Sequence, residues 1–234
     1  MHVDENLNKL KPGLYCVSTP IGNLGDITIR ALEILKNSDL ILCEDTRVSK
    51  KLLSHYEIIK PLKLYHAFNE HKVLKKYIRD MELGKQICLI SDAGTPSISD
   101  PGYLLIKEAN RLNLKVECLP GPTAFIPALV KSGLPADKFV FEGFLPNKKG
   151  RNKRLNFLSK ESRTMIFYES PLRLLKTIKD FKNIFGNERV VSISREISKI
   201  YEETINSSLL EAYNILLKKK VKGEIVIILK GYKK

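Results

Sequence analysis

The feature that most constrains the fold is an apolar, strand-like run that passes directly into a loop of small, turn-forming residues, ICLISDAGTPSISDPG at 87–102. Gly94 and Gly102 allow positive φ angles or a close approach of the backbone to a ligand, and two prolines stiffen the loop. We expect a helix over 103–110, which puts the loop at the carboxyl end of a strand, where open α/β sheets bind ligands. An ordinary βα turn with helix-capping Ser and Asp residues explains one such loop equally well.

Two further expected strands end in loops of the same kind. The run LYCVST at 14–19 leads into PIGNLGD, after which we expect Asp26 to cap a helix that begins near Ile27. The run KVECL at 115–119 leads into PGPTA and then into an apolar helix that ends at Gly133. In a parallel sheet these loops meet at one edge, where they form a pocket of backbone groups suited to a small molecule.

Strand and helix signals alternate along all 234 residues, which favours an α/β fold. We expect two small α/β domains, at 11–119 and 120–234. The first should be a doubly wound, mostly parallel sheet, with strands at 14–19, 40–43, 62–65, 86–90 and 115–119. The second should be a mixed sheet that contains an antiparallel pair, because the runs at 189–194 and 201–205 have only a short connection; its other strands are expected at 138–144, 164–168 and 224–229.

The chain has a formal net charge of +14, from 40 Lys and Arg against 26 Asp and Glu. Such an excess favours a polyanionic partner, since neutralising phosphates releases counterions. A Lys-rich proteome explains the total almost as well. A cluster beside the expected domain linker favours RNA more than the total does, and its members are Lys148, Lys149, Arg151, Lys153 and Arg154.

The cysteines Cys16, Cys43, Cys88 and Cys118 each fall in an expected strand of the first half and are expected to be buried apolar residues. Their spacing does not match a metal site, so we expect no metal. The sequence contains no apolar run long enough to span a bilayer. We therefore expect no membrane association and a soluble, cytoplasmic protein.

Several motifs together resemble the ribosomal RNA small-subunit methyltransferase I family, a branch of the tetrapyrrole methylase-like superfamily. They are TPIGNLGDIT, SDAGTPSISDPG, LPGPTAFIPAL, EDTR at 44–47, HAFNEH at 66–71, EGFLP at 142–146, FYESPLRL at 167–174 and KGE at 222–224. The resemblance runs from about residue 13 to residue 230. EDTR, HAFNEH and EGFLP distinguish it from the tetrapyrrole and diphthamide branches.

The resemblance implies an S-adenosylmethionine-dependent 2′-O-methyltransferase that acts on a cytidine in the decoding region of 16S ribosomal RNA. It also implies a homodimer, the assembled small ribosomal subunit as substrate, and a cofactor cleft between the two domains. The cofactor residues that it implies are Pro20, Asp92, Ala93, Gly94, Thr95, Ser97, Ile98, Thr123, Ala124, Phe167, Tyr168 and Gly223. A purely structural role stays open at three of them: Thr123 as a helix cap, and Phe167 and Tyr168 as core or interface aromatics.

A ribose hydroxyl is a poor nucleophile, so a group must accept its proton as the new bond forms. The candidates for the chemical step are Glu44 and Arg47, just past a strand end, and Asp26 in the first loop. An ion pair between Glu44 and Arg47 that only fixes the turn is an equally good interpretation. His66 and His71 could bind RNA or titrate as a base. The identity of the base is left open.

Two other functions remain open: a methylase that acts on a tetrapyrrole or diphthamide precursor, and a non-catalytic RNA-binding assembly factor. The basic clusters and the EDTR and HAFNEH motifs count against the first. Cofactor binding without methyl transfer would identify the second. A nicotinamide-dependent dehydrogenase is disfavoured because no G-x-G-x-x-G motif follows the first expected strand.

Overall fold

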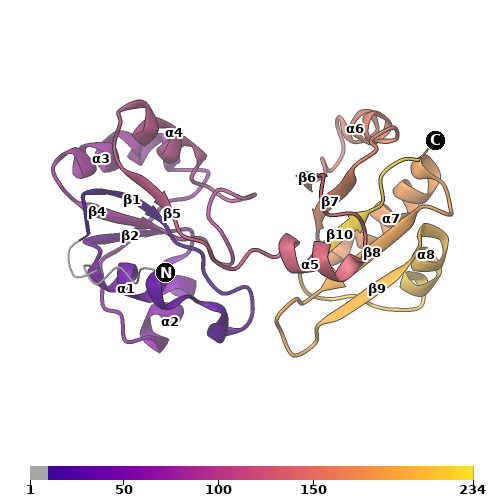
Figure 1. Cartoon of the computed structure of the whole chain (residues 1–234), viewed down its shortest axis with the longest axis horizontal. Helices are drawn as coiled ribbons and strands as arrows, with labels where there is room; N and C mark the ends of the chain where they lie inside the picture. The colour runs from indigo at the N-terminus through magenta and orange to yellow at the C-terminus, as the bar shows by residue number, and fades with distance from the viewer. Residues whose placement is uncertain (1–9, 234) are drawn as a thin grey trace. The chain divides into compact units, whose positions relative to one another are not determined.

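The computed structural model describes residues 10–233, and within them the chain divides into two compact units. The division lies between Thr123 and Ala124, a few residues beyond 119 (Figure 1). We refer to the parts before and after it as the first unit and the second unit. Each unit is built around its own sheet and its own hydrophobic core.

Among the described residues, the first unit contains one sheet of five parallel strands in the order β3-β2-β4-β1-β5. All four residues of β1 and of β2 are buried, as expected for parallel strands that are covered on both faces. The doubly wound, parallel arrangement expected from the sequence is confirmed. The strands are β1 (Gly13–Cys16), β2 (Leu40–Cys43), β3 (Leu62–Leu64), β4 (Gln86–Leu89) and β5 (Val116–Cys118).

Helices cover both faces of this sheet, as Figure 1 shows. Alternate side chains of each strand point to opposite faces, so Tyr15 packs with α1 and α2, while Leu14 packs with α3 and α4. The helices are α1 (Ile29–Asn37), α2 (Thr46–His55), α3 (Glu70–Glu82) and α4 (Tyr103–Arg111).

The start of the first helix differs from the sequence prediction. Asp26 ends a short 3-10 helix, η1 (Leu24–Asp26), and does not cap α1. The cap is Thr28, whose hydroxyl accepts the N–H of Ala31 at 3.1 Å. The prediction was wrong because Asp and Thr are both good N-cap residues, and the one that directly precedes the helical residues takes the position.

The second unit contains, within its described part, a mixed five-stranded sheet in the order β6-β7-β10-β8-β9. β6 and β7 are parallel, and the remaining neighbours are antiparallel, including the expected pair β8 and β9. The mixed sheet is thus confirmed. The strands are β6 (Phe139–Phe144), β7 (Thr164–Glu169), β8 (Val190–Arg195), β9 (Glu203–Ser208) and β10 (Ile225–Leu229).

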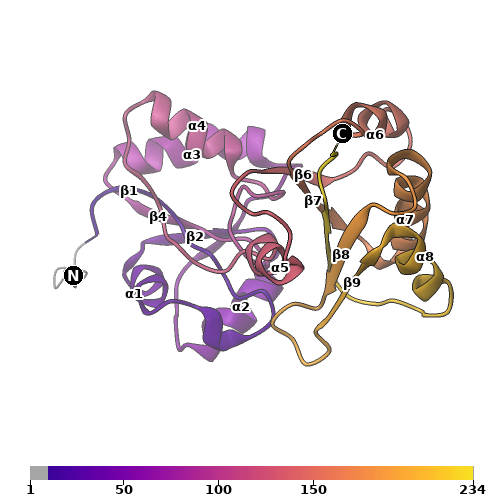
Figure 2. The ribbon, with the colours of Figure 1, turned by 45° about the vertical axis from the view of Figure 1, so that its right-hand side comes forward.

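The core of the second unit lies between this sheet and the helices α7 (Pro171–Phe185) and α8 (Leu209–Leu217), which Figure 2 shows beside it. Helix α6 (Arg151–Leu158) contributes Leu155 and Leu158 to the same core. Helix α5 (Phe125–Ser132) contacts β8 and β10. It ends at Gly133, which has a left-handed φ of 64° and closes the helix as expected.

Each of the four cysteines lies in a strand and is free. Cys16, Cys43 and Cys88 are buried, as expected, and burial raises the pKa of each thiol. Cys118 is exposed, so the expectation of burial was wrong there. It lies on β5, an edge strand of the sheet, where one side has no neighbouring strand to cover it.

Candidate functional site

The loop after β4 is fastened to the loop after β1 by backbone hydrogen bonds. The N–H of Thr19 donates to the carbonyl of Gly94, and the N–H of Gly94 donates to the carbonyl of Thr19, each at 2.9 Å. The Thr19 hydroxyl donates to the carbonyl of Ser91 at 3.0 Å. Gly94 has a φ of 85°, which favours glycine. The convergence of these two loops, expected from the sequence, is confirmed.

Three hydroxyl groups extend this connection to the loop after β5. Thr95 Oγ1 lies 2.9 Å from Ser18 Oγ and 2.6 Å from Thr123 Oγ1. It also donates to the carbonyl of Pro122 at 3.0 Å. The hydroxyl of Thr95 therefore joins the loops that follow β1, β4 and β5.

Gly121 shows how closely these loops pack. A Cβ atom at this position would lie 2.7 Å from Ser18 Cβ, so only glycine fits without a displacement. Thr123 holds the loops together and is not the helix cap, since the N-cap residue of α5 is Ala124. The helix-cap alternative for Thr123 is therefore wrong, and its role in cofactor binding stays a prediction.

The rest of the SDAGTPSISDPG loop has an unusual backbone. Ser97 and Ser99 have φ values of 71° and 68°, a conformation that costs a non-glycine residue about 1–3 kcal/mol. Among the described residues, no oxygen accepts a hydrogen bond from the N–H of Ala93 or Thr95. Free N–H groups on a loop at strand ends can hold a polar ligand. These features favour a ligand-binding loop over an ordinary connection between a strand and a helix.

The carboxylates of Glu44, Asp92 and Asp100 lie near one another at this edge. Burial, followed by the charges of Asp100 and Asp92, raises the pKa of Glu44 to about 7, although a backbone hydrogen bond from Asp92 acts in the opposite direction. Burial and the charge of Asp92 raise the pKa of Asp100 to about 6. Burial also raises the pKa of Asp92, whose Oδ1 accepts the N–H of Asp45 at 3.3 Å. A carboxylate with a pKa near 7 can accept a proton at neutral pH.

Arg47 pairs with Asp45 and not with Glu44. Arg47 Nη2 lies 2.6 Å from Asp45 Oδ2. The backbone N–H of Arg47 donates to Asp45 Oδ1 at 2.8 Å, and this bond makes Asp45 the N-cap of α2. The guanidinium holds the pKa of Asp45 well below its usual range. No basic side chain of the described residues pairs with Glu44. The ion pair that the sequence left open between Glu44 and Arg47 forms between Asp45 and Arg47 instead.

The remaining expected residues of the first unit lie on the same loops. Pro20 is half-buried and follows Thr19, while Ser97 and Ile98 are partly exposed in the loop after β4. Asp26 is exposed at the end of η1, in the loop after β1.

The expected aromatic residues of the second unit lie in different environments. Phe167 is fully buried, and its ring packs against Phe181 with 5.0 Å between centroids. Tyr168 is half-buried and contacts the rings of Phe141 and Phe144, at 5.2 Å and 5.7 Å between centroids. The ring of Phe167 therefore belongs to the hydrophobic core, which was the alternative left open for it.

Gly223 packs against a side chain of its own unit. It has a φ of 92°, and a Cβ atom there would lie 2.3 Å from Glu196 Cδ. The carboxylate of Glu196 accepts the N–H of Glu224 at 3.0 Å. This contact accounts for the glycine without a ligand.

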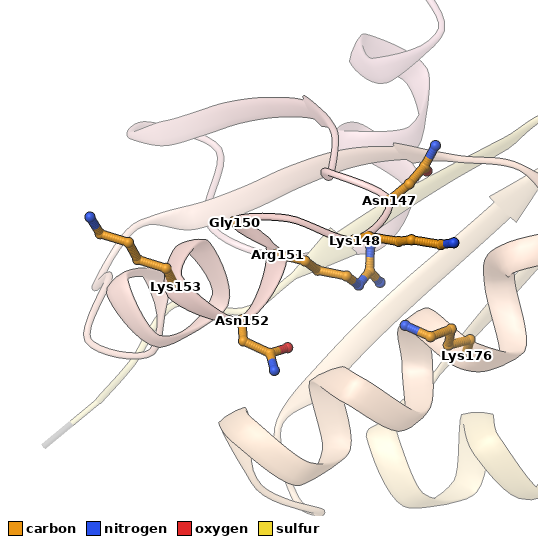
Figure 3. A pocket seen from close by; sticks show the side chains of 7 residues that line it. All are labelled: Asn147, Lys148, Gly150, Arg151, Asn152, Lys153 and Lys176. Atoms are coloured by element: carbon orange, nitrogen blue, oxygen red, sulfur yellow. The ribbon is translucent and has the colours of Figure 1, made fainter.

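The basic cluster separates into exposed residues and residues engaged with other protein groups; Figure 3 draws Lys148, Arg151 and Lys153. Lys148, Lys149 and Lys153 are exposed and have no carboxylate partner among residues 10–233. Arg151 is only 4% exposed, and Arg154 forms two hydrogen bonds to the Glu142 carboxylate, at 2.7 Å and 2.6 Å. The three lysines are therefore available to phosphate groups, whereas the two arginines already have partners in the protein.

Ser18 and Thr19 also belong to the group of residues that joins the loops after β1 and β4, although neither was predicted as a site residue. Both are buried, and their hydroxyls contact the loop after β4. The signal was two hydroxyl residues at the end of an otherwise apolar run, LYCVST, where a buried hydroxyl needs a partner.

The described residues contain neither a metal-binding cluster nor a membrane-spanning helix. No group of three or more His, Cys, Asp or Glu side chains there could hold a metal ion. None of the described helices is both long and apolar enough to cross a membrane.

Comparison with known proteins gives the class of the chain. The profile of the family described as tetrapyrrole (corrin/porphyrin) methylases matches residues 13–213. The chain therefore belongs to this family of methyltransferases.

Curated relatives place the chain more narrowly. The ribosomal RNA small subunit methyltransferase I of Thermotoga maritima is 47% identical over 218 residues, which cover 93% of this chain and 98% of that protein. The protein of the same name from Halalkalibacterium halodurans is 46% identical, over 94% of this chain and 76% of that one. The chain belongs to the ribosomal RNA small subunit methyltransferase I family.

Solved structures share the fold. Cobalt precorrin-4 methyltransferase, a cobalamin biosynthetic enzyme, is 16% identical with a TM-score of 0.68, over 93% of this chain and 94% of that one. Diphthine synthase is 12% identical with a TM-score of 0.72, over 93% and 89%. Uroporphyrin-III C-methyltransferase from Thermus thermophilus, solved with S-adenosyl homocysteine, is 19% identical with a TM-score of 0.64, over 93% and 97%.

Proposed function

We propose that this protein uses S-adenosylmethionine to methylate the ribose 2′-oxygen of a cytidine in the decoding region of 16S ribosomal RNA. The observation that carries the proposal is the edge of the first sheet, where three loops are joined by hydroxyl groups beside a carboxylate with a pKa near 7. The family assignment supports the RNA substrate, because the curated relatives are named for it.

The loop from Ser91 to Ile98 fits the cofactor through its exposed backbone. The free N–H groups of Ala93 and Thr95 can bind polar groups of the cofactor. Gly94 has no side chain, so the cofactor can approach the backbone closely there. When bound, the cofactor supplies an electrophilic methyl group. Asp92 can accept hydrogen bonds from its ribose hydroxyls or its ammonium group. Pro20, Ser97, Ile98 and Thr123 are proposed to complete the part of the site that lies in the first unit.

Glu44 is the proposed base. The carboxylate of Glu44 has a pKa of about 7, so it can take the proton from a ribose hydroxyl at neutral pH. Asp45 is a weaker candidate because Arg47 and the start of α2 hold its charge. Arg47 keeps most of its side chain exposed beside this edge, so it can hold a phosphate of the RNA, with Asp26 on a neighbouring loop as a further polar contact.

Lys148, Lys149 and Lys153 are proposed to bind the phosphates of the RNA, since they are exposed and unpaired within the described part of the chain. We propose the assembled small ribosomal subunit as the substrate, which places the reaction in the cytoplasm. We also propose that the protein acts as a homodimer.

The test is methyl transfer from labelled S-adenosylmethionine to unmodified small ribosomal subunits, followed by nuclease digestion and identification of the labelled nucleoside. We expect label as 2′-O-methylcytidine at one site. Glu44→Gln should lower kcat by about 10²-fold or more while the cofactor Kd stays within about twofold, since a lost base affects only the chemical step.

The controls separate the other functions. Asp92→Asn should weaken cofactor binding measured by calorimetry, which would confirm that the loop after β4 holds the cofactor. Label in a base, or transfer to a tetrapyrrole instead of RNA, would refute the proposal. Cofactor binding without any transfer would identify a non-catalytic RNA-binding protein.

A further inference from the structure

A chain of buried polar groups in the second unit runs from the end of β7 to the loop that carries Lys148. Glu169 is 3% exposed, and its Oε2 accepts the hydroxyl of Thr177 at 2.6 Å. Thr177 is fully buried, and its Oγ1 accepts a hydrogen bond from Arg151 Nη2 at 2.7 Å. The Thr177 hydroxyl thus connects a strand-end carboxylate to a guanidinium.

Two guanidinium groups hold the start of this loop. Arg151 Nη1 donates to the carbonyl of Pro146 at 3.2 Å, and Arg151 Nε donates to Asp180 Oδ2 at 2.9 Å. Arg173 Nη1 donates to the carbonyl of Leu145 at 3.4 Å. Arg173 is itself held by Glu169, at 2.6 Å between Nε and Oε1. Because the guanidinium is planar and rigid, donation in three directions fixes both the arginine and the backbone that it contacts.

The loop borders a hollow of about 640 Å³ (Figure 3). Figure 3 shows Lys148 and Lys176 on the side of the Arg151 guanidinium, whereas Lys153 points away. Lys176 Nζ lies 3.3 Å from Asp180 Oδ2, and that carboxylate is shared with Arg151. Lys148 has no carboxylate partner in the described part of the chain. The hollow therefore has more positive than negative charge on its walls.

Arg151 cannot itself be a phosphate contact, because it is 4% exposed and donates to three oxygens of the protein. The remaining cations of the hollow are exposed. An anion in the hollow would therefore be bound by the exposed lysines, and the buried guanidinium of Arg151 would line the hollow without donating to it.

We propose that the hollow takes a backbone phosphate of the RNA substrate through Lys148 and Lys176, and that Arg151 and Thr177 are positioning residues that fix the loop carrying Lys148. This inference rests on the proposed function for the identity of the polyanion. It adds Lys176 to the RNA contacts and changes the role of Arg151 from a contact to a support.

The test uses Thr177→Val, which keeps the shape of the side chain and alters no charge. Thr164→Val is the matched control, since the Thr164 hydroxyl is also buried in the second unit and donates to the carbonyl of Pro135 at 2.7 Å. For both variants we would measure Tm, the Kd for S-adenosylmethionine, the Kd for small subunits at several salt concentrations, and kcat and KM.

We expect Thr177→Val to raise the Kd and KM for small subunits about tenfold, the size of effect expected when a charged contact is misplaced. The kcat and the cofactor Kd should stay within about twofold. Thr164→Val should lower Tm comparably and leave the Kd for subunits unchanged. Arg151→Lys should behave like Thr177→Val, because lysine keeps the charge and loses the three-way donation.

A double-mutant cycle with Lys148→Ala shows whether the two residues act together. Alone, Lys148→Ala should reduce the salt slope by about one, as expected for one lost phosphate contact. In the Thr177→Val background its effect should be less than about twofold, since residues that act through one another are not additive. As a single variant, Lys176→Ala should also weaken binding to small subunits.

Three results would overturn the inference: unchanged subunit binding by Thr177→Val, full additivity with Lys148→Ala, or an equal loss of binding in Thr164→Val. The binding measurements do not depend on methyl transfer. Wild-type protein that binds subunits but transfers no methyl group would refute the proposed function alone and leave this inference to be decided by the variants.

Discussion

Thr95 Oγ1 and Thr123 Oγ1 lie 2.6 Å apart and connect the loop after β4 to the loop after β5. Thr95 also contacts Ser18 and the carbonyl of Pro122. One hydroxyl therefore joins the three loops of the first unit to which we assign the cofactor.

We expect Thr95→Val to lower the free energy of unfolding by about 1–3 kcal/mol, because it leaves partly buried polar groups without a partner. The cofactor Kd should rise about tenfold, as loops that spread apart no longer match the ligand. Thr95→Ser keeps the hydroxyl and should remain within about twofold of the wild type. Urea unfolding and calorimetry measure the two quantities, and equal behaviour of the valine and serine variants would contradict the assignment.

Gly121→Ala tests the close packing of the loops. The new Cβ atom would lie 2.7 Å from Ser18 Cβ, so we expect a loss of about 1–3 kcal/mol in the free energy of unfolding, typical of overpacking. Ser18→Gly removes the obstructing Cβ atom. Gly121→Ala should therefore cost less free energy of unfolding in the Ser18→Gly background than in the wild type. A strictly additive double variant would show that the contact is not the cause.

The stability of the first unit should depend on pH through Glu44. The folded protein raises the pKa of this carboxyl from 4.5 to about 7, so it holds its proton more tightly than the unfolded chain does. This stabilisation is complete below pH 4.5 and is lost as the pH rises through about 7. Glu44→Gln removes the dependence, and at pH 8 it should be more stable than the wild type by about 1 kcal/mol after allowance for solvent exposure.

Two further variants control the sign of this effect. Asp100→Asn should also gain stability relative to the wild type, but over a lower range, as the pH rises from 3.8 through about 6. Glu108→Gln should show the opposite trend, since Arg111 lowers the pKa of Glu108 and stabilises its charged form above the unfolded pKa. Urea unfolding at pH 3, pH 5 and pH 8 compares all three, because the stabilisation by Glu108 is lost only as the pH falls below 4.5. A gain for Glu44→Gln that does not grow between pH 5 and pH 8 would be inconsistent with the raised pKa.

Charge reversal should locate the RNA surface. We expect Lys148→Glu with Lys149→Glu to weaken subunit binding and to reduce the dependence of log Kd on log salt by about two, one for each lost phosphate contact. Lys36→Glu is the matched control: it is exposed in the last turn of α1, which leads to the amino end of β2 and so to the opposite edge of the sheet from the loops. Similar salt slopes for the control and the double variant would move the RNA surface elsewhere.

The fold was predictable because the strands are short apolar runs bounded by proline and glycine. The order of strands β1, β2 and β4 in space could not be predicted from the runs themselves, since all are equally apolar and buried. The cap of α1 was missed because Asp26 and Thr28 both suit that position, and only the backbone selects between them.

For the candidate site, the sequence identified the loops but not the partners within them. Asp45 and Glu44 are adjacent carboxylates, so the sequence could not say which of them pairs with Arg47. Arg151 lies in a basic cluster between exposed lysines, and composition alone cannot tell a buried guanidinium from an exposed one. Both distinctions depend on the direction of a side chain, which tertiary packing determines.

The place of β4 between β1 and β2 has a consequence for how the protein acquires its site. β4 pairs with strands that precede it by more than forty residues, so its loop takes its final position only after both neighbours have assembled. Pairings between distant segments form slowly. A nascent or partly folded chain would thus have no competent cofactor loop, and cofactor binding should appear late in refolding, together with the last cooperative step of the first unit.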